Sequence, residues 1–151
     1  MALPYFLSDA ADVADLSGWG PILPPRPQVL RTNLFGDAFL FDHVGAVHML
    51  ERGACVCRQI APSQEQFWRT LENDEEGWQL RRLADACGAA GKVLAVDQCY
   101  AFTTLPVFGG SYSEENVRVA PWREWFSFTA DIYRQTGHLP DGAAISLRVT
   151  D

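Results

Sequence analysis

Two groups of carboxylates have the side chains needed to hold a cation or to exchange protons. One lies near the N-terminus and one in the middle of the chain: Asp9, Asp12 and Asp15, then Glu72, Asp74, Glu75 and Glu76. The first group falls in a segment without a clear hydrophobic pattern. The second falls where a helix is expected to start, and the helix dipole favours carboxylates there. We therefore interpret both groups as solvated or structural carboxylates rather than as a metal site or an acid–base pair.

Histidine and cysteine suggest a metal site at one place in the sequence. His48 and the pair Cys55 and Cys57 fall on neighbouring expected strands, so His48 could come near a cysteine. Zinc sites, however, usually show paired C-x-x-C or H-x-x-x-H spacings, and here a single C-x-C places both side chains on one strand face. Cross-strand packing is the favoured interpretation, and we expect no metal site. His138 follows Gly137 and suits a helix C-terminus.

No nucleophile has the local surroundings that catalysis needs. A reactive cysteine requires a nearby base and an electropositive setting. Cys87 instead falls on the apolar stripe of an expected helix, and Cys99 has no partner close in the sequence. No serine lies in a G-x-S-x-G elbow. The run Gly109-Gly110-Ser111 lacks the lysine of a phosphate-binding loop, so a turn is expected there. We therefore predict no catalytic residues, no cofactor and no enzymatic activity.

The net charge limits the partners that the chain can have. Nineteen acidic against twelve basic residues give a formal net charge of −7 at pH 7. Such a surface repels a phosphate backbone unless a local basic patch overrides it, and the arginines are scattered, with only Arg81 and Arg82 adjacent. Direct binding of nucleic acid is therefore disfavoured. Affinity for a basic protein is the natural consequence of the acidic excess.

Length and residue pattern indicate one cytoplasmic domain. A chain of 151 residues is long enough to bury a core without a disulfide or a metal. No lysine or arginine precedes Arg26, so the charged start of a signal peptide is missing. No apolar run approaches the roughly 20 residues of a membrane span, so we expect no membrane contact. The four cysteines are then expected to be reduced thiols.

The elements that would position these residues follow an α+β pattern, with an antiparallel β-meander sheet packed against about three helices. Residues 1–28 form an N-terminal arm that ends in a proline-rich run, and residues 29–151 form the domain. Short β-prone runs separated by glycine-containing turns predict the meander, at residues 38–41, 46–50 and 54–57. Further short strands are expected at residues 93–96 and 117–119, and an alternating last strand at residues 145–150.

Capping signals predict the starts of the first two helices, and a proline the start of the third. Ser63 to Gln66 has the spacing of a capping box. The stretch from Asn73 to Glu76 repeats the capping signal before a second helix, which ends at Gly91. Pro121 suits the first turn of a third helix that runs to about Arg134.

Several pieces of the sequence resemble one family when they are taken in order. They are the run Asn33 to Asp37, Val47-His48, Gly91-Lys92, Gln98 to Phe102, then Pro106, Gly109-Gly110, Tyr112, Asn116 and Leu139 to Gly142. Together they resemble the C-terminal domain of type VI secretion immunity proteins, whose better-known members neutralise DNase effectors. The resemblance extends over roughly residues 30–148. Longer members have a further N-terminal half similar to a GAD-like domain, where this sequence has only the proline-rich arm.

The resemblance implies an antitoxin that binds a cognate effector toxin, with a nuclease as the expected target, and it implies no catalytic residues. Two surface segments are the candidate partner-binding surface: an acidic edge, and a loop that combines a tyrosine with two carboxylates. Their residues are Glu72, Asp74, Glu75, Glu76, Ser111, Tyr112, Glu114, Glu115 and Asn116. The alternative is a small-ligand-binding protein or an enzyme. Its site would be assembled from distant residues such as His48, Tyr100 and Tyr112.

Overall fold

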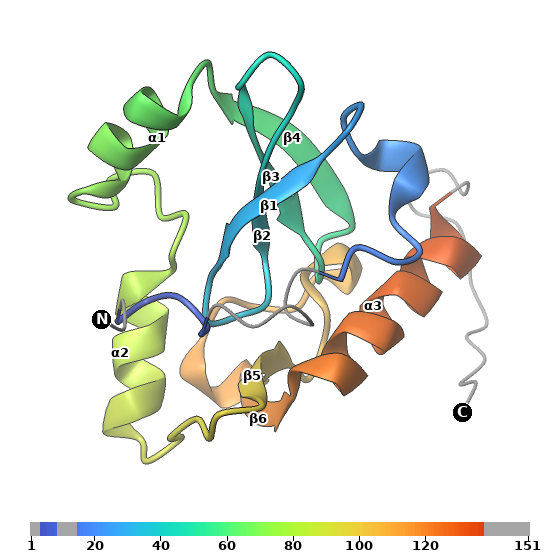
Figure 1. The fold of residues 1–151 in the computed structure, drawn as a ribbon. Helices are drawn as coiled ribbons and strands as arrows, with labels where there is room; N and C mark the ends of the chain where they lie inside the picture. Colours follow the sequence, from blue (N-terminus) through green and yellow to red (C-terminus); the bar gives the residue numbers. More distant parts are fainter. Residues whose placement is uncertain (1–3, 9–14, 138–151) are drawn as a thin grey trace.

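A four-stranded antiparallel sheet forms the centre of the fold, in a computed structural model that describes residues 4–8 and 15–137 (Figure 1). Its strands follow one another in chain order: β1 (Gln28–Thr32), β2 (Ala38–Phe41), β3 (Val47–Glu51) and β4 (Val56–Ala61). The predicted meander is confirmed, although the strand expected at residues 54–57 begins only at Val56 and runs to Ala61. Strand β1 was not marked by the sequence pattern. Asp42 shapes the β2–β3 turn, where its Oδ1 accepts hydrogen bonds from the backbone N–H groups of Val44 and Ala46.

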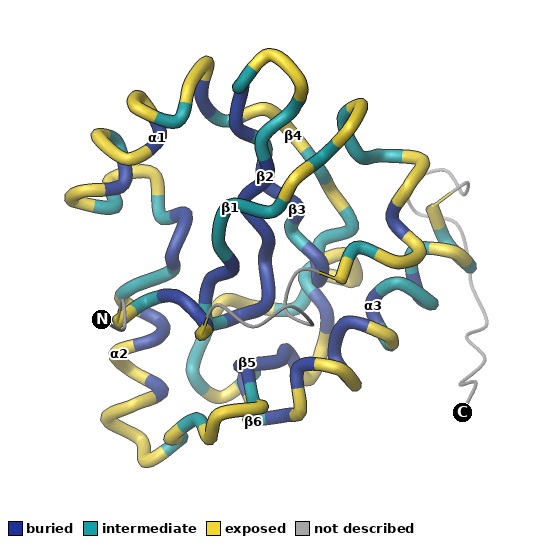
Figure 2. The backbone as a smooth tube through the Cα atoms, in the orientation of Figure 1, coloured by how far each residue is buried: buried dark blue, intermediate teal, exposed yellow. Residues whose placement is uncertain are grey.

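The middle of the sheet is covered on both faces. Ala38, Phe39 and Leu40 of β2 are fully buried, and Figure 2 shows how burial concentrates in β2. Phe39 packs on one face against Phe67, with ring centroids 5.1 Å apart. Leu40 belongs to a second cluster on the other face, together with Trp19. The apolar run in β2 therefore connects two layers, as expected for a strand with no exposed face.

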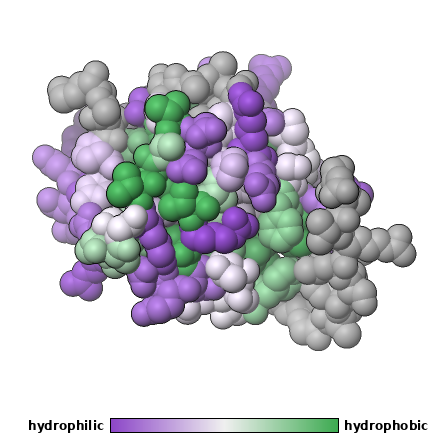
Figure 3. Space-filling model, turned by 90° about the horizontal axis from the view of Figure 1, so that it is seen from below, coloured by the Kyte–Doolittle hydropathy of each residue, from purple (hydrophilic) through white to green (hydrophobic). Residues whose placement is uncertain are grey.

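A second, two-stranded sheet pairs β5 (Gln98–Phe102) with β6 (Val117–Pro121). The strand expected at residues 117–119 is therefore confirmed, and β5 was not predicted. The strand expected at residues 93–96 is wrong, because residues 93–96 pair with no strand of the described part of the chain and Val93 and Val96 face outward. Val93 is 77% and Val96 91% exposed. Figure 3 views the molecule from below, the side on which β5 and β6 lie in Figure 1, and shows hydrophobic side chains gathered in the middle of this face.

Three α-helices complete the described fold: α1 (Gln64–Leu71), α2 (Arg81–Ala89) and α3 (Trp122–Thr136). The Ser63 cap is confirmed, since its Oγ accepts a hydrogen bond from the backbone N–H of Gln66. The third helix starts directly after Pro121 and ends at Gly137, close to the predicted bounds. The predicted α+β class is thus the observed one.

The helix start predicted at Asn73 to Glu76 is wrong. These residues form turns, and α2 begins only at Arg81, after Asp74 and Leu80 have both adopted a φ of +49°. The reason is a tertiary contact, because the turns let Trp78 enter the core and stack on Phe67 with centroids 5.5 Å apart. A continuous helix from residue 73 would not make this contact.

The described end of the N-terminal arm is part of the core. Trp19 is fully buried and stacks on Tyr133 of α3, with ring centroids 5.1 Å apart. Arg52 lies beneath the same segment, where its Nη2 donates to the carbonyl oxygen of Asp15 and its guanidinium lies 3.6 Å from the ring centroid of Phe126. Burial lowers the pKa of Arg52 to about 10.

Asp9, Asp12, His138 and the strand expected at residues 145–150 lie outside the described residues.

Candidate functional site

The two segments predicted to bind a partner lie on opposite sides of one groove. The groove has a volume of about 690 Å³ and runs between the turns before α2, one face of α2 and the loop that follows Gly110. Four of the nine predicted residues line it: Asp74, Glu75, Tyr112 and Glu114. Segments that are distant in the sequence are thus combined into one surface, which local patterns could not show.

The other five predicted residues do not line the groove, although all are its neighbours in the sequence: Glu72, Glu76, Ser111, Glu115 and Asn116. Asn116 has a different role. Its Nδ2 donates to the carbonyl oxygens of Thr104 (2.9 Å) and Ser111 (2.8 Å), and its Oδ1 accepts from the N–H of Thr104 (2.9 Å). Asn116 therefore holds the loop in shape, and both hydrogens of its amide nitrogen are used within the chain.

Arg81 fixes the acidic side of the groove. Its guanidinium donates to the carbonyl oxygens of Leu71 (2.8 Å) and Glu72 (3.2 Å) and to Oε1 of Gln79 (2.7 Å). Asp74 reinforces the same turns, because its Oδ1 accepts a hydrogen bond from the N–H of Gln79 at 3.1 Å. Arg81 is thus used to order the backbone that presents the carboxylates.

Lys92 fixes the opposite side. Its Nζ lies 2.5 Å from Oε1 of Glu114 and donates to the carbonyl oxygens of Glu114 (2.6 Å) and Val117 (2.8 Å). Lys92 is itself held by Tyr100, whose hydroxyl donates to the Lys92 carbonyl oxygen at 2.7 Å. The loop is therefore tied to the end of α2, and the charge of Glu114 is largely compensated within the chain.

Tyr112 is the aromatic residue of the groove. Its ring contacts Phe102 edge-on with centroids 5.2 Å apart, while 51% of the residue stays exposed. Partial burial, and then the charges of Asp37 and Glu51, raise the pKa of Tyr112 to about 12. The phenol stays protonated at neutral pH and can donate a hydrogen bond from a half-exposed ring, which is the usual chemistry of an interface anchor.

The charge of the groove is more balanced than the sequence suggested. Three acidic side chains line it, Asp74, Glu75 and Glu114, together with the two basic side chains Arg81 and Arg82. Arg82 is exposed and forms no ion pair with any residue of the described part of the chain. Sequence analysis missed Arg82. The only signal was its adjacency to Arg81, which does not reveal that a groove passes by.

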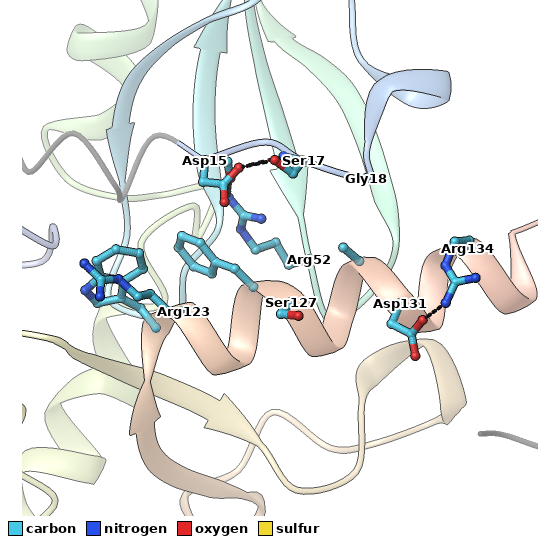
Figure 4. A pocket seen from close by; sticks show the side chains of 11 residues that line it. Asp15, Ser17, Gly18, Arg52, Arg123, Ser127, Asp131 and Arg134 are labelled. Carbon is cyan, nitrogen blue, oxygen red and sulfur yellow. Dashed lines mark hydrogen bonds and ion pairs between the residues drawn. The ribbon is translucent and has the colours of Figure 1, made fainter. Parts of the chain in front are cut away.

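A second groove lies along α3 (Figure 4), with a volume of about 710 Å³. The aromatic rings of Trp122 and Phe126 form part of its wall, but its charged side chains already have partners within the chain. Asp15 Oδ1 accepts hydrogen bonds from the N–H and the hydroxyl of Ser17, and these bonds lower the pKa of Asp15. Arg134 pairs with Asp131. This groove therefore offers a partner less unsatisfied chemistry than the first.

The residues considered for an alternative ligand site do not converge. His48 Nε2 lies 2.8 Å from Oδ2 of Asp42, Tyr100 bonds to the Lys92 carbonyl oxygen, and only Tyr112 lines the first groove. Among residues 4–8 and 15–137, no cluster of three histidine, cysteine or acidic side chains is suited to a metal ion. Within the same residues, no helix is long and apolar enough to cross a membrane.

Only Cys57 of the expected pair lies on a strand, although Cys55 and Cys57 both pack against the cluster around Trp19. Cys55 precedes β4 with a φ of +55°, and its thiol lies 3.7 Å from the carbonyl oxygen of Arg52, to which it donates. Cys57 belongs to β4 and pairs with Leu50, whereas His48 lies opposite Gln59. The histidine and the cysteines are therefore separate features of the sheet.

Residues 62–133 match the family described as T6SS immunity protein Tdi1, C-terminal. The resemblance drawn from the sequence motifs is confirmed over this range, which contains all residues that line the first groove. No curated protein matches the chain. Among solved structures, the crystal structure of Atu4351 from Agrobacterium tumefaciens has a similar fold, with a TM-score of 0.50 and 18% sequence identity. The similarity covers 78% of this chain and 59% of that one, so the chain spans less than two thirds of that protein.

Proposed function

We propose that this chain, whose residues 62–133 belong to the family of Tdi1-type type VI secretion immunity proteins, binds a cognate effector toxin and neutralises it by direct contact. The observation that carries the proposal is the position of the family match, since the matched range supplies both sides of the groove. Protection of this kind requires a surface that binds the toxin and does not require a catalytic activity. We expect the purified protein to show no nuclease or hydrolase activity.

We further propose a nuclease as the target and the bacterial cytoplasm as the place of action. A nuclease presents a basic surface to its substrate, and an acidic protein with a net charge of −7 attracts such a surface over a distance. An inhibitor that occupies this surface excludes nucleic acid without binding nucleic acid itself. A toxin that acts on nucleic acid in the cytoplasm must be bound by its inhibitor in the cytoplasm.

The proposed contact surface is the first groove and its rim. Glu75 lines the groove, and Glu76 and Glu115 are sequence neighbours of lining residues. All three are exposed and form no ion pair with the described residues. Tyr112 provides the aromatic anchor. Ser111 and Asn116 contribute by shaping the loop, since Asn116 binds the Ser111 carbonyl oxygen.

The test combines rescue of cells with binding kinetics. The chain is co-expressed with the candidate type VI effector found by sequencing the neighbouring genes, and association of the purified proteins is followed by interferometry. The variant Glu75→Lys/Glu115→Lys should associate several-fold more slowly and protect less, because rim charges act mainly on the association rate. The control Glu65→Lys/Glu124→Lys changes the net charge equally on α1 and α3, and should lose less.

Circular dichroism must show that both double variants stay folded. The choice of surface is wrong if both lose association rate to the same extent. The immunity function is refuted if the unmodified chain neither binds nor protects against that effector.

A further inference from the structure

Arg82 is the basic side chain of the groove that has no partner among the described residues. Its neighbour Arg81 donates to three oxygen acceptors in the turns before α2, and Lys92 is held by Glu114. Arg82 makes no hydrogen bond or ion pair with the described residues, although Asp74 and Glu75 line the same groove. A surface meant only to attract positive charge would not carry this guanidinium beside its carboxylates.

The geometry of α2 presents Arg82 to whatever occupies the groove. Arg82 and Ala86 are four residues apart on the helix, so they share one face, and both line the groove. The small side chain of Ala86 leaves the guanidinium room to lie along the helix. Leu80, which is only partly buried, adds apolar surface, and Tyr112 lines the groove from the loop on the other side.

We propose that the groove selects a protein segment of mixed charge, with a carboxylate that pairs with Arg82 and a basic side chain that meets Asp74 and Glu75. An apolar side chain between them covers the exposed part of Leu80. The inference rests on the proposed function, since it specifies what the bound effector presents to this surface. It differs from simple charge attraction, in which Arg82 would only weaken binding.

The physical reason is the cost of burying an unpaired charge. A guanidinium that loses its water on binding must gain a charged partner, or the complex is strongly destabilised. Its planar donors fit a carboxylate with two parallel hydrogen bonds. A partner that offers only basic groups is rejected at this position, so Arg82 gives specificity through repulsion as well as attraction.

The test is a charge reversal with opposite outcomes under the two explanations. Arg82→Glu makes the groove more acidic, so simple attraction of a basic surface predicts tighter binding to the effector. Mixed-charge recognition instead predicts at least tenfold weaker binding, mainly through faster dissociation, and Arg82→Gln should lie between. The matched control is Arg26→Glu, which changes the net charge equally in the segment before β1, remote from α2 in Figure 1, and should not weaken binding.

A second readout identifies the opposing group directly. Each surface aspartate and glutamate of the effector is replaced by lysine, and one of these replacements should restore binding to Arg82→Glu while weakening binding to the unmodified chain. Binding of Arg82→Glu that equals or exceeds that of the unmodified chain overturns the inference and leaves the proposed function standing. Failure of the unmodified chain to bind the effector overturns both.

Discussion

Cys87 and Cys57 show how burial separates two residues of the same type. Cys87 is fully buried on α2, in the cluster that also holds Leu83 and Ala84. Cys57 is only partly buried at the edge of the cluster around Trp19. Burial raises the pKa of both thiols, that of Cys57 to about 11, so neither is a thiolate at neutral pH. Both cysteines are therefore packing residues rather than nucleophiles.

We predict that Cys87→Ser lowers the free energy of unfolding more than Cys57→Ser does. A hydroxyl buried without a good partner costs about 1–3 kcal/mol, and at the partly exposed position of Cys57 water can bond to it. Urea unfolding at equilibrium measures both values, and an unchanged slope shows that the unfolded state is comparable. Equal shifts of the midpoint would mean that the core around α2 is not as close-packed as described.

The loop from Thr103 to Asn116 is the element on which the groove depends most. Gly110 approaches the backbone of Thr104 so closely that an added Cβ would lie 1.8 Å from the Thr104 carbonyl oxygen. By contrast, a Cβ added at Gly88 on α2 would meet no atom within 4 Å. Gly110 is therefore required by the close approach of the Thr104 backbone, whereas Gly88 could be replaced by a residue with a side chain.

We predict that Gly110→Ala destabilises the protein and weakens effector binding, because the loop that carries Tyr112 must move away from Thr104. Gly88→Ala should stabilise the protein by about 0.5–1 kcal/mol, since alanine restricts the unfolded chain and favours the helix. Thermal unfolding measures both effects, and binding of Gly88→Ala serves as the control. A melting temperature for Gly110→Ala at or above that of the unmodified chain would contradict the described loop.

At the scale of the whole molecule, the net charge acts at a distance and the groove acts on contact. The formal charge of the chain is −7, whereas the groove lining carries only −1 from three acidic and two basic side chains. Most of the acidic excess therefore lies elsewhere on the chain. Attraction of a basic effector and recognition by the groove are then separate properties, and each can be measured alone.

We predict that the association rate with the effector falls steeply as salt rises, while the dissociation rate changes little. Added salt shortens the Debye length from about 10 Å at 0.1 M to about 3 Å at 1 M, which screens exposed charges before contact. Interferometry over a series of salt concentrations gives both rates. An association rate that does not depend on salt would show that the charge of −7 has no role in the encounter.

Much of the fold follows from interactions between residues that are close in the sequence. Ser63 caps α1 through the N–H group three residues later, and Gly137 ends α3 as its position predicts. The turn at Asp42 joins two strands that pair directly. Each of these features depends on hydrogen bonds or on periodicity within a few residues, so the sequence alone determines them, together with the net charge and the absence of a recognisable catalytic motif.

Only the tertiary structure decided the features that depend on distant partners. The helix start predicted at Asn73 does not form, because Trp78 is buried against Phe67 instead. Strand β5 exists because β6 pairs with it and because the Tyr100 N–H bonds to the carbonyl oxygen of Leu34. The groove itself arises where Lys92 ties the loop to α2. The free energy of these contacts comes from surfaces that meet only after the chain has folded, so no local pattern of residues records them.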